Sequence, residues 1–247
     1  MSVLIELCVE GVDGAIAAAE AGADRIELCA SLMEGGITPS VGTILATLAA
    51  VRVPVMVMVR PRGGDFLYSA REFASMLDDV AAIRETGAAG VVFGCLTPAG
   101  AVDEGRTRAL VEQAGPMACT FHRAFDMAAD PAAALEALIR CGVGRVLTSG
   151  RAPTAVLGQA VLAALVTQAD GRIAVMGCGA LRPDTIGAVR RATGLGEMHF
   201  SAQVEEPSRM VYRNPALAMG SAAPSREFVR IGTDPALVRA TIAAARA

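Results

Sequence analysis

The sequence predicts an α/β protein, a single eight-fold β/α (TIM) barrel whose parallel strands are enclosed by outer helices. Short apolar runs alternate eight times with alanine-rich helical stretches, and this order implies parallel strands joined by crossover helices. The length of 247 residues is close to the ~250 residues of such a barrel. An open, doubly wound sheet is the alternative, but its first turn carries GxGxxG, and this chain has CVEGVDG there.

The apolar runs and the stop signals place each element along the chain. The predicted strands lie near residues 3–8, 24–29, 54–60, 90–95, 117–122, 144–149, 172–178 and 196–201. The predicted helices lie near residues 12–21, 40–51, 70–86, 104–114, 131–141, 154–168, 183–192 and 234–246. Glycine follows the first helix in AGAD at 21–24, a usual carboxyl-terminal stop. Asp130-Pro131 and Asp234-Pro235 each supply an N-cap followed by proline at the first helical position.

One long irregular segment, residues 202–231, follows the eighth predicted strand and contains Pro207, Pro215 and Pro224. No linker or low-complexity stretch divides the chain, so we expect residues 1–247 to form one barrel domain. A loop of this length at the active end of a barrel is typical of a lid or an oligomer contact.

The charge and composition of the chain limit the binding partners and the cellular compartment that we expect for it. The net charge is -3, which leaves no basic surface for nucleic acid or an anionic membrane. The opening MSVLIELC lacks the basic start of a signal peptide, and no apolar run is long enough for a transmembrane helix. We therefore expect a cytoplasmic protein. Cysteines of a cytosolic protein seldom form disulfides, and the absence of a CxxC pair argues against a structural zinc site or a redox motif. The six cysteines occupy positions 8, 29, 95, 119, 141 and 178.

Five of the predicted strands carry polar or soft side chains at alternate positions near their carboxyl ends. Strand side chains alternate faces, and the outer face of a barrel wrapped by helices must be apolar. The polar set must therefore point into the barrel, at the end where such barrels keep their sites. Its members are Glu6, Cys8, Glu27, Cys29, Met58, Arg60, Thr120, His122, His199 and Ser201.

Acid–base chemistry is one use of this set. Both histidines of the chain have inward parity, and proton transfer needs a group that titrates near neutrality beside carboxylates. The candidate catalytic residues are Glu6, Glu27, Arg60 and His122. The alternative is a buried ion network that fills the barrel, with Glu6 or Glu27 paired to Arg60. No organic cofactor is indicated.

Anion binding is a second use. The loop RPRGGDF combines two arginines with a Gly-Gly pair, which suits a carboxylate or phosphate, and loops after the sixth and seventh strands carry further glycines. The alternative is a salt-bridged turn with structural glycines. The candidate ligand-binding residues are Arg60, Arg62, Gly63, Gly64, Asp65, Ser149, Gly150, Gly177, Gly179, His199 and Ser201.

Copper binding is a third use. Cys8 and Cys29 end neighbouring strands at matching positions, so two thiolates could hold one Cu(I), with the Met58 thioether as a helper. His122 is too far around the ring of strands to join the same ion. The alternative is that both cysteines are buried thiols without a ligand.

Several strings resemble the CutC copper-homeostasis family. They are IELCVEG at 5–11, AGADRIELCASLMEGGITPS at 21–40, VRPRGGDFLYS at 59–69, AGPMACTFHRAFDM at 114–127, VLTSG at 146–150 and EMHFSA at 197–202. The resemblance implies a cytosolic, often oligomeric β/α barrel that binds copper through cysteines, and Cys8 and Cys29 stand in its IELC and RIELC strings. It brings no established reaction. Cys178 in GCGAL departs from the expected Gly or Ala, and the tail of segment 202–231 matches nothing in the family pattern.

Two functions follow from these observations. The first is copper homeostasis with Cu(I) binding by Cys8 and Cys29. The second is a TIM-barrel enzyme acting on a small anionic metabolite, favoured by the RPRGG loop and the acids and histidines, which a copper carrier does not need. If the two cysteine sulfurs converge in the structure, copper binding is favoured. If they lie instead below a polar pocket that holds an ordered anion, the enzyme is favoured. A homo-oligomer is expected in either case.

Overall fold

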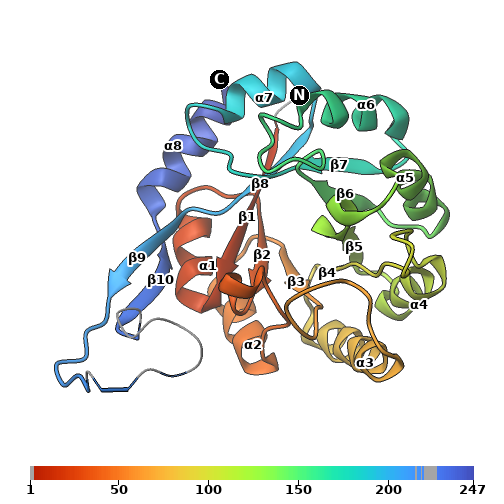
Figure 1. The fold of residues 1–247 in the computed structure, drawn as a ribbon. Helices are drawn as coiled ribbons and strands as arrows, with labels where there is room; N and C mark the ends of the chain where they lie inside the picture. Colours follow the sequence, from red (N-terminus) through yellow and green to blue (C-terminus); the bar gives the residue numbers. More distant parts are fainter. Residues whose placement is uncertain (1–2, 215, 218, 220–226) are drawn as a thin grey trace.

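The computed structural model describes residues 3–214, 216–217, 219 and 227–247 (Figure 1). Eight parallel strands form a closed barrel in sequence order, and the last strand pairs with the first. Helices surround the strands on the outside (Figure 1). The predicted fold class is therefore confirmed.

The observed elements follow the predicted ones closely. The strands are β1 Leu4–Glu10, β2 Arg25–Cys29, β3 Val55–Met58, β4 Gly90–Phe93, β5 Ala118–Phe121, β6 Arg145–Thr148, β7 Ala174–Gly177 and β8 Glu197–Phe200. The helices are α1 Gly11–Glu20, α2 Val41–Ala50, α3 Ala70–Thr86, α4 Glu104–Ala114, α5 Pro131–Arg140, α6 Gln159–Ala169, α7 Ile186–Thr193 and α8 Pro235–Arg246. None of the described helices combines the length and apolar composition needed to cross a membrane.

The predicted capping residues act as expected. The side chain of Asp130 accepts hydrogen bonds from the backbone N–H groups of Ala132 and Ala133 at the start of α5. Helix α6 begins later than predicted, at Gln159, because the residues before it form turns instead. These differences leave the order and the number of barrel elements unchanged.

The two faces of the barrel strands differ as the alternation predicts. Outward residues such as Ile5 and Leu28 are fully buried in the core that the strands share with the helices. Inward residues form separate clusters, one of which contains Cys29, Met56 and Met58. Each strand therefore presents its polar and soft positions to the barrel interior.

The segment after β8 differs from the prediction of one irregular region. Gln203–Pro207 (β9) and Val229–Thr233 (β10) pair as an antiparallel ribbon that projects from the barrel beside α1 (Figure 1). Only β10 (VRIGT) alternates in sequence, and β9 (QVEEP) ends in a proline, so the sequence gives little sign of this pairing. Pro215 and Pro224 lie outside the described residues, and a lid or oligomer role for this segment stays a prediction.

Candidate functional site at the barrel mouth

An ion network occupies the barrel interior near the amino ends of the strands. Arg25 donates to Glu6 and, over 2.6 Å, to Glu197, and Arg145 pairs with the same Glu197 carboxylate. Arg145 also donates to Thr120 Oγ1. We call Glu6, Arg25, Arg145 and Glu197 the floor network.

The alternative hypothesis of a buried ion network is right about Glu6 but wrong about its partner, because the guanidinium that meets Glu6 is that of Arg25 and not of Arg60. Sequence reasoning missed Arg25, Arg145 and Glu197, although each has the inward parity of its strand. Arg25 lies two residues before Glu27, and Glu197 two residues before His199. Applying the alternation back to the first residue of each strand would have found them.

His199 lies between two carboxylates directly above the floor network. Its Nδ1 is 2.8 Å from Glu6 Oε1, and its Nε2 is 3.8 Å from Glu27 Oε2. Burial lowers the pKa of His199, but the charge of Glu27 and the contacts with Cys8 and Glu6 outweigh burial and raise it well above its ordinary value. Burial likewise opposes ionisation of Glu6, yet His199 and Arg25 lower the pKa of Glu6 to about 2. His199 is therefore an imidazolium between two carboxylates, and its inward position agrees with the parity of its strand.

The sulfur atoms of Cys8 and Cys29 converge at 3.8 Å. The expectation that they occupy matching positions is wrong in register, since Cys8 pairs with Glu27 and Cys29 with Glu10. Strands in a barrel are staggered around the axis, so side chains two residues out of register can still meet inside. Gly36 lies against Cys29, because a Cβ there would be 2.9 Å from Cys29 Sγ.

Both thiols have pKa values above the ordinary cysteine value. The hydrogen bond with Cys29, followed by burial, raises the pKa of Cys8. The same hydrogen bond lowers the pKa of Cys29, but burial and the nearby Glu27 charge outweigh it and raise the pKa to about 11. The two cysteines are therefore protonated at neutral pH in the absence of a cation.

The thiol pair adjoins further metal-ligating groups. Within the described residues, one ligand atom each of Cys8, Glu27 and His199 lies within 4.8 Å of the others. Met58 packs in the same interior cluster as Cys29. Cys29 therefore adjoins the group formed by Cys8, Glu27 and His199, with its Sγ 3.7 Å from Glu27 Oε2, and Met58 packs beside it.

A cavity of about 380 Å³ opens beside this group at the carboxyl ends of the strands. We call it the mouth cavity. Three of the four predicted catalytic residues, Glu27, Arg60 and His122, line it, while Glu6 is fully buried and belongs to the floor network. The remaining lining residues are Cys8, Glu34, Gly35, Met58, Phe66, Arg123, Asp126, Met127, Leu147 and His199.

Arg60 is buried without the carboxylate partner that the sequence predicted. Its Nη1 donates to the carbonyls of Glu34 at 2.6 Å and Gly36 at 3.0 Å, and its Nη2 to the carbonyl of Gly64 at 2.8 Å. The three carbonyls belong to loops at the mouth, and they occupy the Nη1 and Nη2 donors of Arg60 in place of the Glu6 or Glu27 carboxylate. Arg60 therefore holds two mouth loops together while keeping its charge.

His122 lies against Arg60 and Phe66 rather than beside the carboxylates expected from the sequence. Its ring centroid is 4.9 Å from that of Phe66, and its Nδ1 accepts a hydrogen bond from the backbone N–H of Ala124. Burial and the charge of Arg60 lower the pKa of His122 to about 3. A Cβ at Gly94 would lie 2.5 Å from the ring, so the absence of a side chain there makes room for it. His122 is a neutral imidazole.

The RPRGGDF loop is arranged differently from the predicted anion cradle. Arg62 turns away from the mouth and pairs with Glu72 at 2.6 Å and Asp65 at 3.0 Å. Gly63 packs on the side chain of Glu34, and Gly64 has a positive φ of 81° and offers its carbonyl to Arg60. In the described structure, only Arg60 of this loop's predicted set lines the mouth cavity.

Close packing explains the glycines after β6 and β7. A Cβ at Gly150 would meet the carbonyl of Gly158 at 2.4 Å, and one at Gly177 would meet Leu195 at the same distance. The Ser149 hydroxyl donates to the Asp126 carboxylate, with 3.0 Å between Oγ and Oδ2. Gly179, Ser201 and His199 line a smaller adjoining cavity of about 240 Å³, together with Cys8, Leu32, Gly35, Arg123, Cys178, Ala180, Leu181, Arg182, Phe200 and Gln203.

Comparison with known proteins identifies the family. Residues 3–204 match the family model described as the CutC family. This chain belongs to the CutC family. The resemblance expected from the sequence motifs is thereby confirmed.

Three relatives of this CutC chain illustrate the match. A CutC family protein of Mesorhizobium japonicum is 61% identical over 244 residues, which cover 99% of this chain and 95% of the relative. The human copper homeostasis protein cutC homolog is 44% identical over 243 residues, covering 98% of this chain and 89% of the relative. A crystal structure of CutC from Streptococcus agalactiae matches with a TM-score of 0.76 at 29% identity, over 80% of this chain and 97% of that chain.

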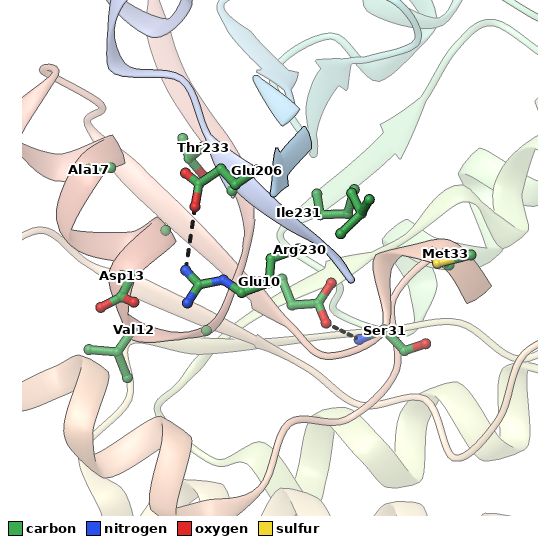
Figure 2. A pocket seen from close by; sticks show the side chains of 14 residues that line it. Glu10, Val12, Asp13, Ala17, Ser31, Met33, Glu206, Arg230, Ile231 and Thr233 are labelled. Carbon is green, nitrogen blue, oxygen red and sulfur yellow. Dashed lines mark hydrogen bonds and ion pairs between the residues drawn. The ribbon is translucent and has the colours of Figure 1, made fainter. Parts of the chain in front are cut away.

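This CutC chain also has a larger cavity, of about 530 Å³, outside the barrel between α1 and the β9–β10 ribbon. Figure 2 shows that its polar groups bond to one another: Arg230 pairs with Glu206 over 3.4 Å, and Glu10 accepts from the backbone N–H of Ser31. The carboxylate of Glu10 thus anchors the loop that covers Cys29. Among the described residues neither a thiol nor a histidine lines this cavity, so its lining lacks the thiol and imidazole ligands found at the barrel mouth.

Proposed function

We propose that this CutC protein serves copper homeostasis by binding Cu(I) between the sulfur atoms of Cys8 and Cys29. The observation that carries the proposal is their separation of 3.8 Å inside the barrel. Metal–thiolate bonds of roughly 2.3 Å allow one ion to bridge two sulfurs at that separation. Thiolates are the soft ligands that favour Cu(I), and the Met58 thioether lies in the same cluster.

Charge balance supports the same site. Two thiolates and one Cu(I) carry a net charge of −1, which a nearby cation would offset. The imidazolium of His199 contacts Cys8 and supplies that charge. His199 therefore acts here as a charge partner, and the sulfurs hold the ion.

Copper has to displace the thiol protons, because the pKa values of both cysteines are raised. Deprotonation becomes easier as pH rises, so the apparent Cu(I) affinity should increase with pH through the neutral range. The increase is at most tenfold per thiol per pH unit below the thiol pKa, since each bound proton competes with one copper–sulfur bond.

An anaerobic Cu(I) titration against a chromophoric chelator tests the proposal. Wild type should bind one Cu(I) per chain, and Cys8→Ser with Cys29→Ser should abolish this binding because a hydroxyl is too hard to replace a thiolate. Cys119→Ser with Cys141→Ser is the matched control, since those thiols lie outside the barrel interior and should not matter. Full binding by the Cys8/Cys29 double variant would refute the site.

The cluster of Cys8, Glu27 and His199 offers a mixed donor set that would suit a harder ion such as Zn²⁺. The same titration with Zn²⁺ separates the two cases. Cu(I) binding that depends on Cys29 supports the proposal. Zinc binding that is tighter than Cu(I) binding, does not depend on Cys29 and requires His199 would contradict the proposal.

An enzyme acting on a small anionic metabolite is the second candidate, favoured by the mouth cavity. Glu27, Arg60 and His122 line it together, at the end of the barrel where catalytic groups are placed. Glu6 would act only through His199, which it contacts. Mass spectrometry of the small molecules released from the purified protein tests this candidate. If no anionic metabolite is enriched among them, the result would weigh against the enzyme.

We also propose a cytoplasmic homo-oligomer in which the segment after β9 contacts a second copy. Val211 is 98% exposed and Tyr212 76% exposed, so two large apolar side chains face solvent in the isolated chain. Light scattering should show an oligomer that Val211→Glu weakens. A monomeric wild type would contradict the assignment.

A further inference from the structure

His122, which lines the mouth cavity, has a buried ring nitrogen without a hydrogen-bond partner on the described part of the protein, as do Glu27 Oε1 and Arg60 Nε. The side chain of His122 is 4% exposed, and its Nε2 has no partner within the described residues. Because Nδ1 accepts from Ala124, the proton of the neutral ring lies on Nε2, which is therefore a donor. An unpaired buried donor is costly, so a ligand acceptor is the natural partner for it.

The charge around this donor favours an anion. Arg60 is 5% exposed, lines the same cavity and meets only backbone carbonyls, so within the described residues its positive charge has no carboxylate partner. Phe66 brings the two together, since its ring lies 5.1 Å from Arg60 Cζ and 4.9 Å from the His122 ring. Donor and cation thus share one wall of the cavity.

Each acidic residue that lines the mouth cavity either faces a positive charge other than Arg60 or is exposed to water. Glu27 faces the imidazolium of His199, and Asp126 pairs with Arg123 at 2.8 Å. Glu34 is exposed to water, which screens its charge. One positive charge, that of Arg60, is left for a ligand, and a single negative charge would balance it.

We propose that the mouth cavity binds the carboxylate of a small organic acid, with one oxygen accepting from His122 Nε2–H and the charge facing Arg60. Met58, Phe66 and Leu147 supply apolar walls for a short carbon chain, and about 380 Å³ is space for a molecule of a few carbons. This inference rests on the second candidate function, for which it names the ligand class, and is independent of copper.

Ligand-observed NMR and calorimetry on the full-length protein test it with propionate and butyrate as probes. Neutral propionamide, which has the same shape without the charge, and inorganic phosphate are the comparison ligands. We expect saturable binding of the two carboxylates and at least tenfold weaker binding of the amide and of phosphate. Binding that the amide matches, stronger binding of phosphate, or no binding of the carboxylates would overturn the proposal.

Two variants localise the binding. His122→Phe keeps a ring against Phe66 but removes Nε2, and His122→Asn keeps an acceptor for the Ala124 N–H but is too short to reach the cavity. Each should weaken propionate binding at least tenfold, about 1.4 kcal/mol. Arg172→Gln, on the outer surface of the barrel, removes a positive charge elsewhere and should bind as wild type. Unchanged affinity in a folded His122→Asn protein would overturn the assignment of the donor.

The binding experiment distinguishes failure of the carboxylate site from failure of the second candidate function, an enzyme acting on an anionic metabolite. Binding is measured without turnover, so an anionic metabolite found bound in the purified protein but insensitive to His122 would support the enzyme and refute the carboxylate site. No copper is added, so the result does not depend on Cys8 or Cys29.

Discussion

The floor and the mouth of the barrel interior differ in how fully their polar groups are partnered. In the floor network, Arg25 lies between Glu6 and Glu197, and each charge meets an opposite one. At the mouth, Glu27 Oε1 and His122 Nε2 are buried without a partner among the described residues. Because unpaired buried groups are costly, this difference supports our proposal that the mouth takes a ligand, whereas the charges of the floor already pair with one another.

The largest expected effect is at the floor. Glu6→Gln removes the charge that Arg25 and His199 both contact and leaves two buried cations underpaired. Breaking a buried pair costs about 3–5 kcal/mol, so urea denaturation should show a loss of that size. Glu136→Gln breaks an exposed pair with Arg172 and is the matched control, for which little change is expected. Equal losses in both variants would contradict the structural role of the floor.

A smaller effect is expected where the mouth meets the barrel wall. Gly94→Ala places a methyl group 2.5 Å from the His122 ring, and such overpacking costs about 1–3 kcal/mol. Gly105→Ala in α4 meets nothing closer than 3.6 Å and should be neutral or stabilising by up to about 1 kcal/mol. Urea denaturation measures both, and an unaffected Gly94→Ala protein would show that the ring is not confined.

A further expected effect is a pH dependence of the free energy of unfolding. The pKa of His122 is about 3, below its ordinary value of 6.5, so the unfolded chain binds more protons than the folded one between those values. Stability should therefore fall as pH decreases from about 6.5 towards 3, and His122→Asn should flatten that part of the profile. The ring signals of His122 should stay unchanged in NMR spectra between pH 5 and 8. A His122 titration near neutrality would contradict the neutral ring.

The same comparison shows how far the sequence determines the site. Alternation along the strands was enough to turn Glu6, Glu27 and His199 inward, and capping signals at Asp130 were enough to start α5. These features depend on neighbours within a few residues. They are the parts of the fold that local chemistry fixes.

The partners of the inward side chains depended on geometry that local patterns do not contain. Which arginine meets Glu6 follows from the stagger of β1 and β2, which also sets Cys8 opposite Glu27. The carbonyls that hold Arg60 come from loops whose path is set by the whole barrel. The sequence therefore predicted several of the residues that enter the barrel, but it missed Arg25, Arg145 and Glu197 and did not predict which side chains pair.

X-ray absorption spectroscopy of the Cu(I)-loaded protein tests the central claim most directly, because it identifies the atoms bound to copper. The account predicts two sulfur ligands in wild type, from Cys8 and Cys29, which lie 3.8 Å apart in the folded chain. It also predicts that Cys29→Ser loses one of the two sulfur ligands and keeps that of Cys8. A copper environment of nitrogen and oxygen alone, or one unchanged in Cys29→Ser, would contradict it.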